Sequence, residues 1–116
     1  MKKTSHSAFT RLVEIMATLR GPNGCPWDRE QTSDTIKLYL IEETYEVLEA
    51  LEAKDWPAFK DELGDLLLQI VFHSQLMAES GAFTIDKVAQ AIVDKLVRRH
   101  PQVAKLHFRT TGSVIG

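Results

Sequence analysis

The sequence contains a single cysteine, Cys25, in 116 residues. One cysteine excludes an internal disulfide, and a thiolate zinc site would need further ligands. No apolar run approaches the roughly 18 residues that a membrane-spanning helix requires. The basic N-terminal segment also lacks the uninterrupted apolar stretch of a signal peptide. We therefore expect a cytoplasmic protein that does not associate with a membrane.

A charge excess of one sign is also missing. The chain has 14 Lys and Arg against 16 Asp and Glu, a net charge of −2. This balance gives no indication of binding to a nucleic acid polymer. Strand-type alternation, internal repeats and low-complexity tracts are absent as well. A chain of this length is expected to form one domain and to bury roughly two thirds of its unfolded surface.

What the sequence does contain is helical periodicity, which predicts an all-α fold. A predicted loop, GPNGCPWD, follows the first helix because its glycines and prolines interrupt any helix. Asp55 is predicted to cap the third helix, with Pro57 in its first turn, and Gly81 to end it. The four predicted helices span residues 7–20, 32 or 33 to 53, 56–79 and 84–101.

The third predicted helix is apolar around most of its circumference. Its leucines, isoleucine, valine and phenylalanine leave only a narrow polar stripe. A helix of this kind is expected to be buried, and three amphipathic neighbours of the same chain are too few to cover it. We therefore predict a four-helix bundle that is completed by tight homodimerisation, as a dimer or a dimer of dimers.

The second predicted helix carries a stripe of carboxylates within an arc of roughly 120°. Taken alone, such a stripe is typical of a solvated helix face. Its members are Glu42, Glu43, Glu46 and Glu49.

The polar stripe of the third predicted helix favours a metal site instead. It comprises Glu62, Asp65, Gln69 and His73, without lysine or arginine. Buried carboxylates are costly unless they are paired or bind a metal. Oxygen ligands of this kind suit Mg²⁺, with Mn²⁺ as a substitute. The sequence thus predicts a Mg²⁺ site formed by two pairs of ligands, Glu43 with Glu46 and Glu62 with Asp65.

Two single residues on or near this stripe have simpler interpretations. His73 is more typical of a histidine satisfied in the core than of a ligand, and the Glu-x-x-His signature of a di-iron bundle is absent. Cys25, next to Pro26 and Trp27, indicates loop packing, because no base is predicted beside it.

A basic cluster ends the fourth predicted helix. Lys95, Arg98, Arg99 and His100 could bind phosphate oxygens. They could equally complement the negative end of the helix dipole, and the sequence leaves both interpretations open.

These motifs, taken in order, resemble the MazG family of nucleoside triphosphate pyrophosphohydrolases. The carboxylates form the pattern EExxE followed by ExxD, and CPWD, DELGDLLLQIVFH and DKLVRRHP complete a resemblance over residues 9–101. The resemblance implies an all-α fold that dimerises tightly. It further implies Mg²⁺-dependent cleavage of a (deoxy)nucleoside triphosphate between the α- and β-phosphates, giving the monophosphate and pyrophosphate, as nucleotide-pool housekeeping.

Residue roles carried over from the family follow the motif. Glu43, Glu46, Glu62 and Asp65 would bind the metal, and Glu42 would orient or deprotonate the attacking water. Three basic residues would bind the triphosphate, and an aromatic residue of the loop would stack on the base or merely anchor the loop. These last candidates are Lys95, Arg98, Arg99 and Trp27.

Two departures from the family pattern keep alternatives open. Family members commonly carry two such domains, whereas this sequence predicts one, over residues 1–101. A divergent tail, residues 102–116, replaces the usual HPHVF with HPQVAKLHF. The alternatives are a catalytically weak module that binds metal and nucleotide, and a purely structural helical dimer with solvated carboxylates.

Overall fold

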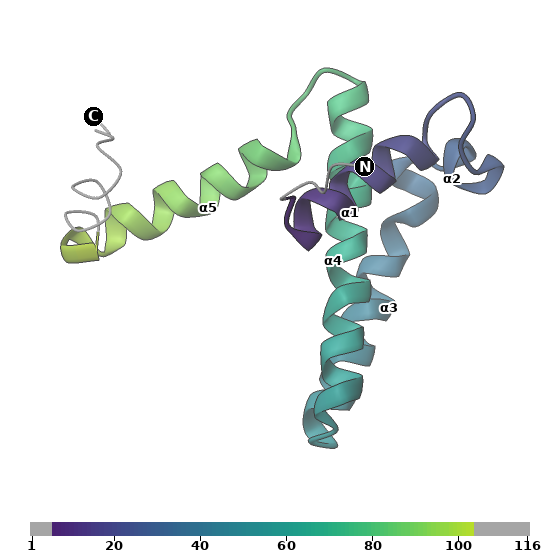
Figure 1. Ribbon diagram of the computed structural model, residues 1–116. Coiled ribbons are helices and arrows are strands. Elements are labelled where there is room, and N and C mark those ends of the chain that lie inside the picture. Colours follow the sequence, from purple (N-terminus) through teal and green to yellow (C-terminus); the bar gives the residue numbers. More distant parts are fainter. Residues whose placement is uncertain (1–5, 104–116) are drawn as a thin grey trace.

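The structure, a computed structural model, describes residues 6–103, which contain five α-helices and no strand. Figure 1 shows α3 and α4 side by side as a long hairpin, with α1 crossing it and α5 extending away. The all-α prediction is therefore confirmed. The helices are α1 (Ala8–Leu19), α2 (Pro26–Glu30), α3 (Ser33–Glu52), α4 (Trp56–Glu79) and α5 (Ile85–Arg99).

A side-chain cap precedes each of the four long helices, and Asp55 caps α4 as predicted. The side chains of Ser7, Thr32, Asp55 and Thr84 each accept a hydrogen bond from the backbone N–H three residues later. Each cap satisfies a donor that has no partner within its own helix. The predicted bounds of the four long helices are correct to within two residues.

The predicted loop is wrong in one respect, because it contains the short helix α2. Pro26 occupies the first helical turn, where its missing N–H costs nothing, and Asp28 in the same turn suits the positive end of the helix. Of the glycines and prolines that indicated a loop, Gly21, Pro22 and Gly24 precede this helix and only Pro26 lies within it. Trp27 thus lies on a helical turn.

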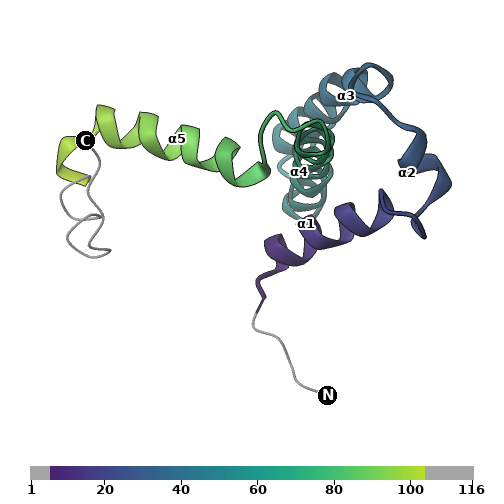
Figure 2. The same cartoon turned by 90° about the horizontal axis from the view of Figure 1, so that it is seen from above.

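The core forms where α1 crosses the upper part of α3 and α4. Met16, Ile36, Val71, Phe72 and Leu76 are buried there in one cluster. Burying each such side chain contributes about 2 kcal/mol, so this crossing holds the three helices together. Seen from above, α1 runs across the end of the hairpin, with α2 in the connection between α1 and α3 (Figure 2).

The expected four-helix bundle does not form within one chain. Helix α5 contacts α4 but contributes no buried residue, and its apolar Ile92, Val93 and Leu96 are exposed. The part of α3 that faces away from α4 is also apolar and exposed. Completion of the bundle by a second copy stays a prediction.

None of the helices in the described range is long and apolar enough to cross a lipid bilayer. Most of the predicted tail, residues 104–116, lies outside the described residues.

Candidate functional site

Three carboxylates from the hairpin meet at one point. Glu43 comes from α3, and Glu62 and Asp65 come from α4. One carboxylate oxygen from each lies within 4.8 Å of the other two. The structure therefore brings together three of the four predicted metal ligands, and these form a candidate metal-binding cluster.

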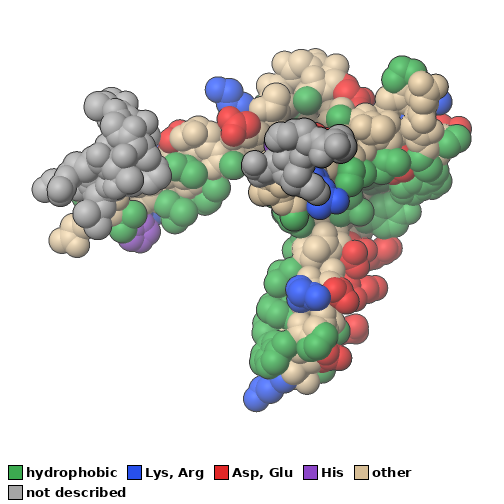
Figure 3. All heavy atoms as spheres, in the orientation of Figure 1, with side chains coloured by type: hydrophobic (Ala, Val, Ile, Leu, Met, Phe, Trp, Pro, Cys, Tyr) green, Lys and Arg blue, Asp and Glu red, His purple; other side chains and the backbone are tan. Residues whose placement is uncertain are grey.

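The geometry of the two helices explains this convergence. Glu43 lies on the side of α3 that packs against α4, the same side as the buried Ile36, Val47 and Ala50. Glu62 and Asp65 are three residues apart and therefore share one face of α4. Two of the carboxylates, Glu43 and Glu62, are half-buried, whereas Asp65 is exposed. Figure 3 shows acidic side chains gathered along one edge of the hairpin and hydrophobic side chains along the opposite edge.

Burial and mutual repulsion shift the acid–base equilibria of the cluster. Burial raises the pKa of Glu43, and the negative charges of Asp65, Glu46 and Glu42 raise it further. Burial also raises the pKa of Glu62, and the charges of Glu46, Asp65 and Glu43 add to this effect. Glu46 and Glu42 are exposed, but they lie near enough to act on the cluster electrostatically. Within residues 6–103, none of the ion pairs includes a cluster residue.

The cluster fits a hard divalent cation. Glu43 Oε1 and Glu62 Oε1 are buried and have no hydrogen-bond partner within the described residues. Buried oxygens of this kind are costly unless something compensates them. A cation with a preference for oxygen ligands would satisfy both atoms and cancel the repulsion between the carboxylates.

An aromatic pocket adjoins the cluster. The pocket has a volume of about 260 Å³, and Trp27, Tyr39 and Phe72 line it together with Met16, Leu19, Asp28, Leu68, Gln69 and Glu43. Because Glu43 belongs to both features, the pocket and the carboxylate cluster share a wall. Trp27 is half-exposed, and its ring meets that of Phe72 edge-on, with centroids 6.4 Å apart.

Arg20 fixes the segment that carries the tryptophan. Its guanidinium donates hydrogen bonds to the backbone oxygens of Asp28, Arg29 and Gln31 at 2.7–3.1 Å. The same group forms a two-pronged ion pair with Glu79 near the end of α4, at 2.5 and 2.9 Å. One side chain thus ties α1, α2 and α4 together beside the pocket.

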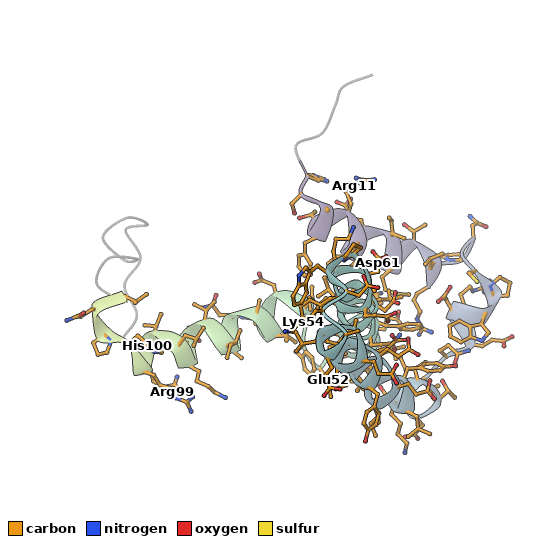
Figure 4. All side chains as sticks on the ribbon, turned by 90° about the horizontal axis from the view of Figure 1, so that it is seen from below. Arg11, Glu52, Lys54, Asp61, Arg99 and His100 are labelled. Atoms are coloured by element: carbon orange, nitrogen blue, oxygen red, sulfur yellow. The ribbon has the colours of Figure 1, made fainter. Side chains whose placement is uncertain are left out.

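The predicted phosphate-binding residues lie elsewhere within one chain. Lys95, Arg98 and Arg99 lie on α5, which extends away from the hairpin. Figure 4 shows Arg99 and His100 near the far end of this helix, remote from Asp61 of α4. The structure therefore does not bring the basic cluster to the carboxylates of its own chain.

The sequence was compared with models of known protein families. The family model described as the MazG nucleotide pyrophosphohydrolase domain matches residues 31–104. The chain belongs to the MazG family.

Similar MazG sequences include proteins of several bacteria. The chain is 55% identical over 95 residues to the nucleoside triphosphate pyrophosphohydrolase/pyrophosphatase MazG of Thermotoga maritima, covering 82% of this chain and 37% of that protein. It is 54% identical over 94 residues to the nucleoside triphosphate pyrophosphohydrolase of Escherichia coli K12, covering 80% and 36%. It is 48% identical over 104 residues to the uncharacterized protein YabN of Bacillus subtilis, covering 90% and 21%. The chain thus spans about a third or less of the length of these relatives.

The sequence-based site candidates do not include every residue at the site. Tyr39, Asp28 and Gln69 line the pocket, but none was a sequence-based candidate. The position of Gln69, one helical turn after Asp65 on the acidic stripe, was the available signal. His73 follows on the same stripe, and its Nε2 is buried without a partner within the described residues.

Proposed function

We propose that this MazG domain hydrolyses (deoxy)nucleoside triphosphates between the α- and β-phosphates, producing the nucleoside monophosphate and pyrophosphate. The observation that carries the proposal is the convergence of Glu43, Glu62 and Asp65, with two orphaned buried oxygens, beside an aromatic pocket. The activity printed in the names of similar proteins supports the same reaction. Housekeeping of the nucleotide pool is the role that such a reaction would serve.

The proposed metal ligands are Glu43, Glu46, Glu62 and Asp65, and the proposed ion is Mg²⁺, with Mn²⁺ as a substitute. When bound, the ion would neutralise phosphate charge and lower the pKa of a coordinated water. Glu42, exposed beside the cluster, is proposed to orient or deprotonate the attacking water. The aromatic pocket is proposed to hold the base, with Trp27 at its mouth.

The proposed active form is a homodimer or a dimer of dimers. The outer face of α3 is apolar and exposed, as are parts of α4 and α5. Exposed apolar surfaces of this extent are typical of protein interfaces. The residues on the outer face of α3 are Leu38, Ile41, Tyr45 and Leu48.

Dimerisation also bears on the proposed phosphate ligands. Lys95, Arg98 and Arg99 do not reach the carboxylates of their own chain, so their role requires α5 of a second copy or another position of α5. If the site forms between copies, Glu43→Gln and Arg98→Ala chains are each inactive alone, but an equal mixture of them should recover about a quarter of wild-type activity. Half of the dimers are then mixed, and each mixed dimer has one intact site out of two. No recovery, from chains that exchange freely, would exclude such a shared site.

The test of the proposed function measures pyrophosphate and monophosphate release from the eight common NTPs and dNTPs, with and without Mg²⁺. Wild-type protein is expected to release both products only with the metal, and Glu62→Gln to release neither. Release of orthophosphate and a diphosphate would contradict the assigned bond. Mg²⁺ binding without turnover on any substrate would instead favour a module that binds metal and nucleotide.

A further inference from the structure

Gln69 is the most deeply buried polar residue of the pocket lining. Only 8% of its surface is exposed, and Oε1 has no hydrogen-bond partner within the described residues. A buried amide oxygen without a partner costs free energy, and such groups in native proteins call for an explanation. Because Gln69 lines the aromatic pocket, a ligand in that pocket can supply the missing donor.

Two further polar side chains of the pocket offer acceptors only, whereas the Gln69 amide carries an acceptor oxygen and a donor nitrogen. Asp28 and Glu43 contribute carboxylates, which only accept hydrogen bonds when ionised. The remaining surface is largely aromatic and aliphatic. The pocket therefore combines flat apolar walls with a set of acceptors, and it suits a planar aromatic group whose edge donates hydrogen bonds.

The size of the pocket limits what can enter. A volume of about 260 Å³ lies just below the usual range for ligand pockets, so one aromatic heterocycle fits better than a whole nucleotide. Glu43 joins the pocket to the carboxylate cluster, and a nucleotide can thus place its phosphates at the cluster and its base in the pocket.

From these observations we infer that Gln69, together with Asp28, is a specificity-determining residue that selects nucleobases bearing an exocyclic amino group. This inference rests on the proposed function. Cytosine and uracil test it most directly, because they differ only at position 4 and the neighbouring ring nitrogen. Cytosine presents an amino donor where uracil presents a carbonyl acceptor, which would face the acceptors of the pocket.

The first experiment compares kcat/KM for CTP and UTP at saturating Mg²⁺. We expect wild-type protein to favour CTP at least roughly tenfold, because a site that pairs a donor at position 4 discriminates against a base with an acceptor at that position. Gln69→Met keeps the length of the side chain and removes its polar atoms. We expect this variant to reduce the ratio to within about threefold, mainly through KM for CTP.

Gln69→Glu is the matched variant, because it keeps the shape of the side chain and an acceptor oxygen at Oε1 while it replaces the donor nitrogen with a second oxygen. It is expected to retain the preference for CTP. Both variants should retain the Mg²⁺-dependent rise in melting temperature, which shows that the fold and the carboxylate cluster are intact. A wild-type preference for UTP, or a CTP to UTP ratio unchanged by Gln69→Met, would overturn the assignment.

A binding measurement separates this inference from the proposed function. Titration calorimetry with CMP and UMP in the presence of Mg²⁺ reports base selection without turnover. Tighter binding of CMP that is lost in Gln69→Met supports the role of Gln69 even if no triphosphate is hydrolysed. Equal affinity for CMP and UMP, or binding of neither, refutes it even if hydrolysis is observed.

Discussion

Replacing Glu43 by glutamine should invert the order of stability between wild type and variant when Mg²⁺ is added. Without metal, the variant loses a carboxylate that repels its neighbours. Two unit charges 4.8 Å apart, the upper limit within the cluster, repel by about 1 kcal/mol in a water-like dielectric, which applies because Asp65 is exposed. We therefore expect metal-free Glu43→Gln to be more stable than wild type by about 1 kcal/mol.

With metal, the wild-type protein gains free energy of unfolding by mass action. At a Mg²⁺ concentration of about 100 times Kd, the gain is about 2.7 kcal/mol, or about 10 °C in Tm for a domain of this size. Glu43→Gln lacks a ligand and should gain much less. Wild type then becomes the more stable protein, and the two melting curves exchange their order.

The assay is thermal unfolding at pH 7.5 with a Mg²⁺ titration and constant protein concentration. Asp61→Asn is the matched control, since it removes one negative charge next to Glu62. The Asp61 side chain is 74% exposed, and within the part of the chain that the structure describes it pairs only with its neighbour Lys60, at 3.7 Å. Exposed pairs of this kind contribute little, so the control should show the wild-type response. A full Mg²⁺ response in Glu43→Gln, equal to that of Asp61→Asn, would refute the metal site.

Three further predictions concern the framework around the site. Gly24→Ala should lower Tm and move the emission of Trp27, because a Cβ at this position would lie 2.1 Å from the last backbone oxygen of α1. Gly64→Ala should raise the free energy of unfolding by about 0.5–1 kcal/mol, because a Cβ at this position meets nothing within 4 Å in one chain. If the variant instead loses the dimer in size-exclusion chromatography, a second copy packs against this position. Hydrogen bonding to Arg20 lowers the pKa of Glu79. The pair therefore stabilises the fold fully above the unfolded pKa of about 4.5, and this stabilisation disappears as pH falls through the folded pKa. The difference in Tm between wild type and Glu79→Gln should therefore be full at pH 7 and shrink below about pH 4.5.

The long helices were predictable because their signals are local. Thr32, Asp55 and Thr84 each precede an amphipathic segment, and each caps the helix that follows. The convergence of Glu62 and Asp65 was predictable for a similar reason, since a three-residue spacing places two side chains on one helix face, whereas Glu46 is exposed outside the cluster. The position of Glu43 opposite Glu62 additionally needed the tight turn between α3 and α4, which the sequence indicated through Asp55 and Pro57.

The pocket and its support were not predictable, because they depend on contacts between distant segments. Arg20 is separated from its partner Glu79 by 59 positions, and nothing near either residue indicates the pairing. The helical turn that carries Trp27 was hidden by the glycines and prolines before it. Placement of α5 is the clearest case, since most of its apolar face, including Ile92 and Leu96, is exposed and packs against nothing within residues 6–103.

The distribution of burial explains why the acidic residues lie where a core would be expected. Above the carboxylates, α1 crosses the hairpin and the interior is filled by Met16, Ile36 and Phe72. Below this crossing, α1 no longer covers α3 and α4, and the half-buried Glu43 and Glu62 occupy their interface. An apolar pair at these positions would stabilise the hairpin without metal, since burial alone raises the pKa of both carboxyl groups and so disfavours their charged forms. The charges of Glu43 and Glu62 therefore lower the free energy of unfolding of the metal-free protein, and a bound cation would restore it. The predicted exchange in the order of the two melting curves measures this trade-off between metal-free stability and metal affinity.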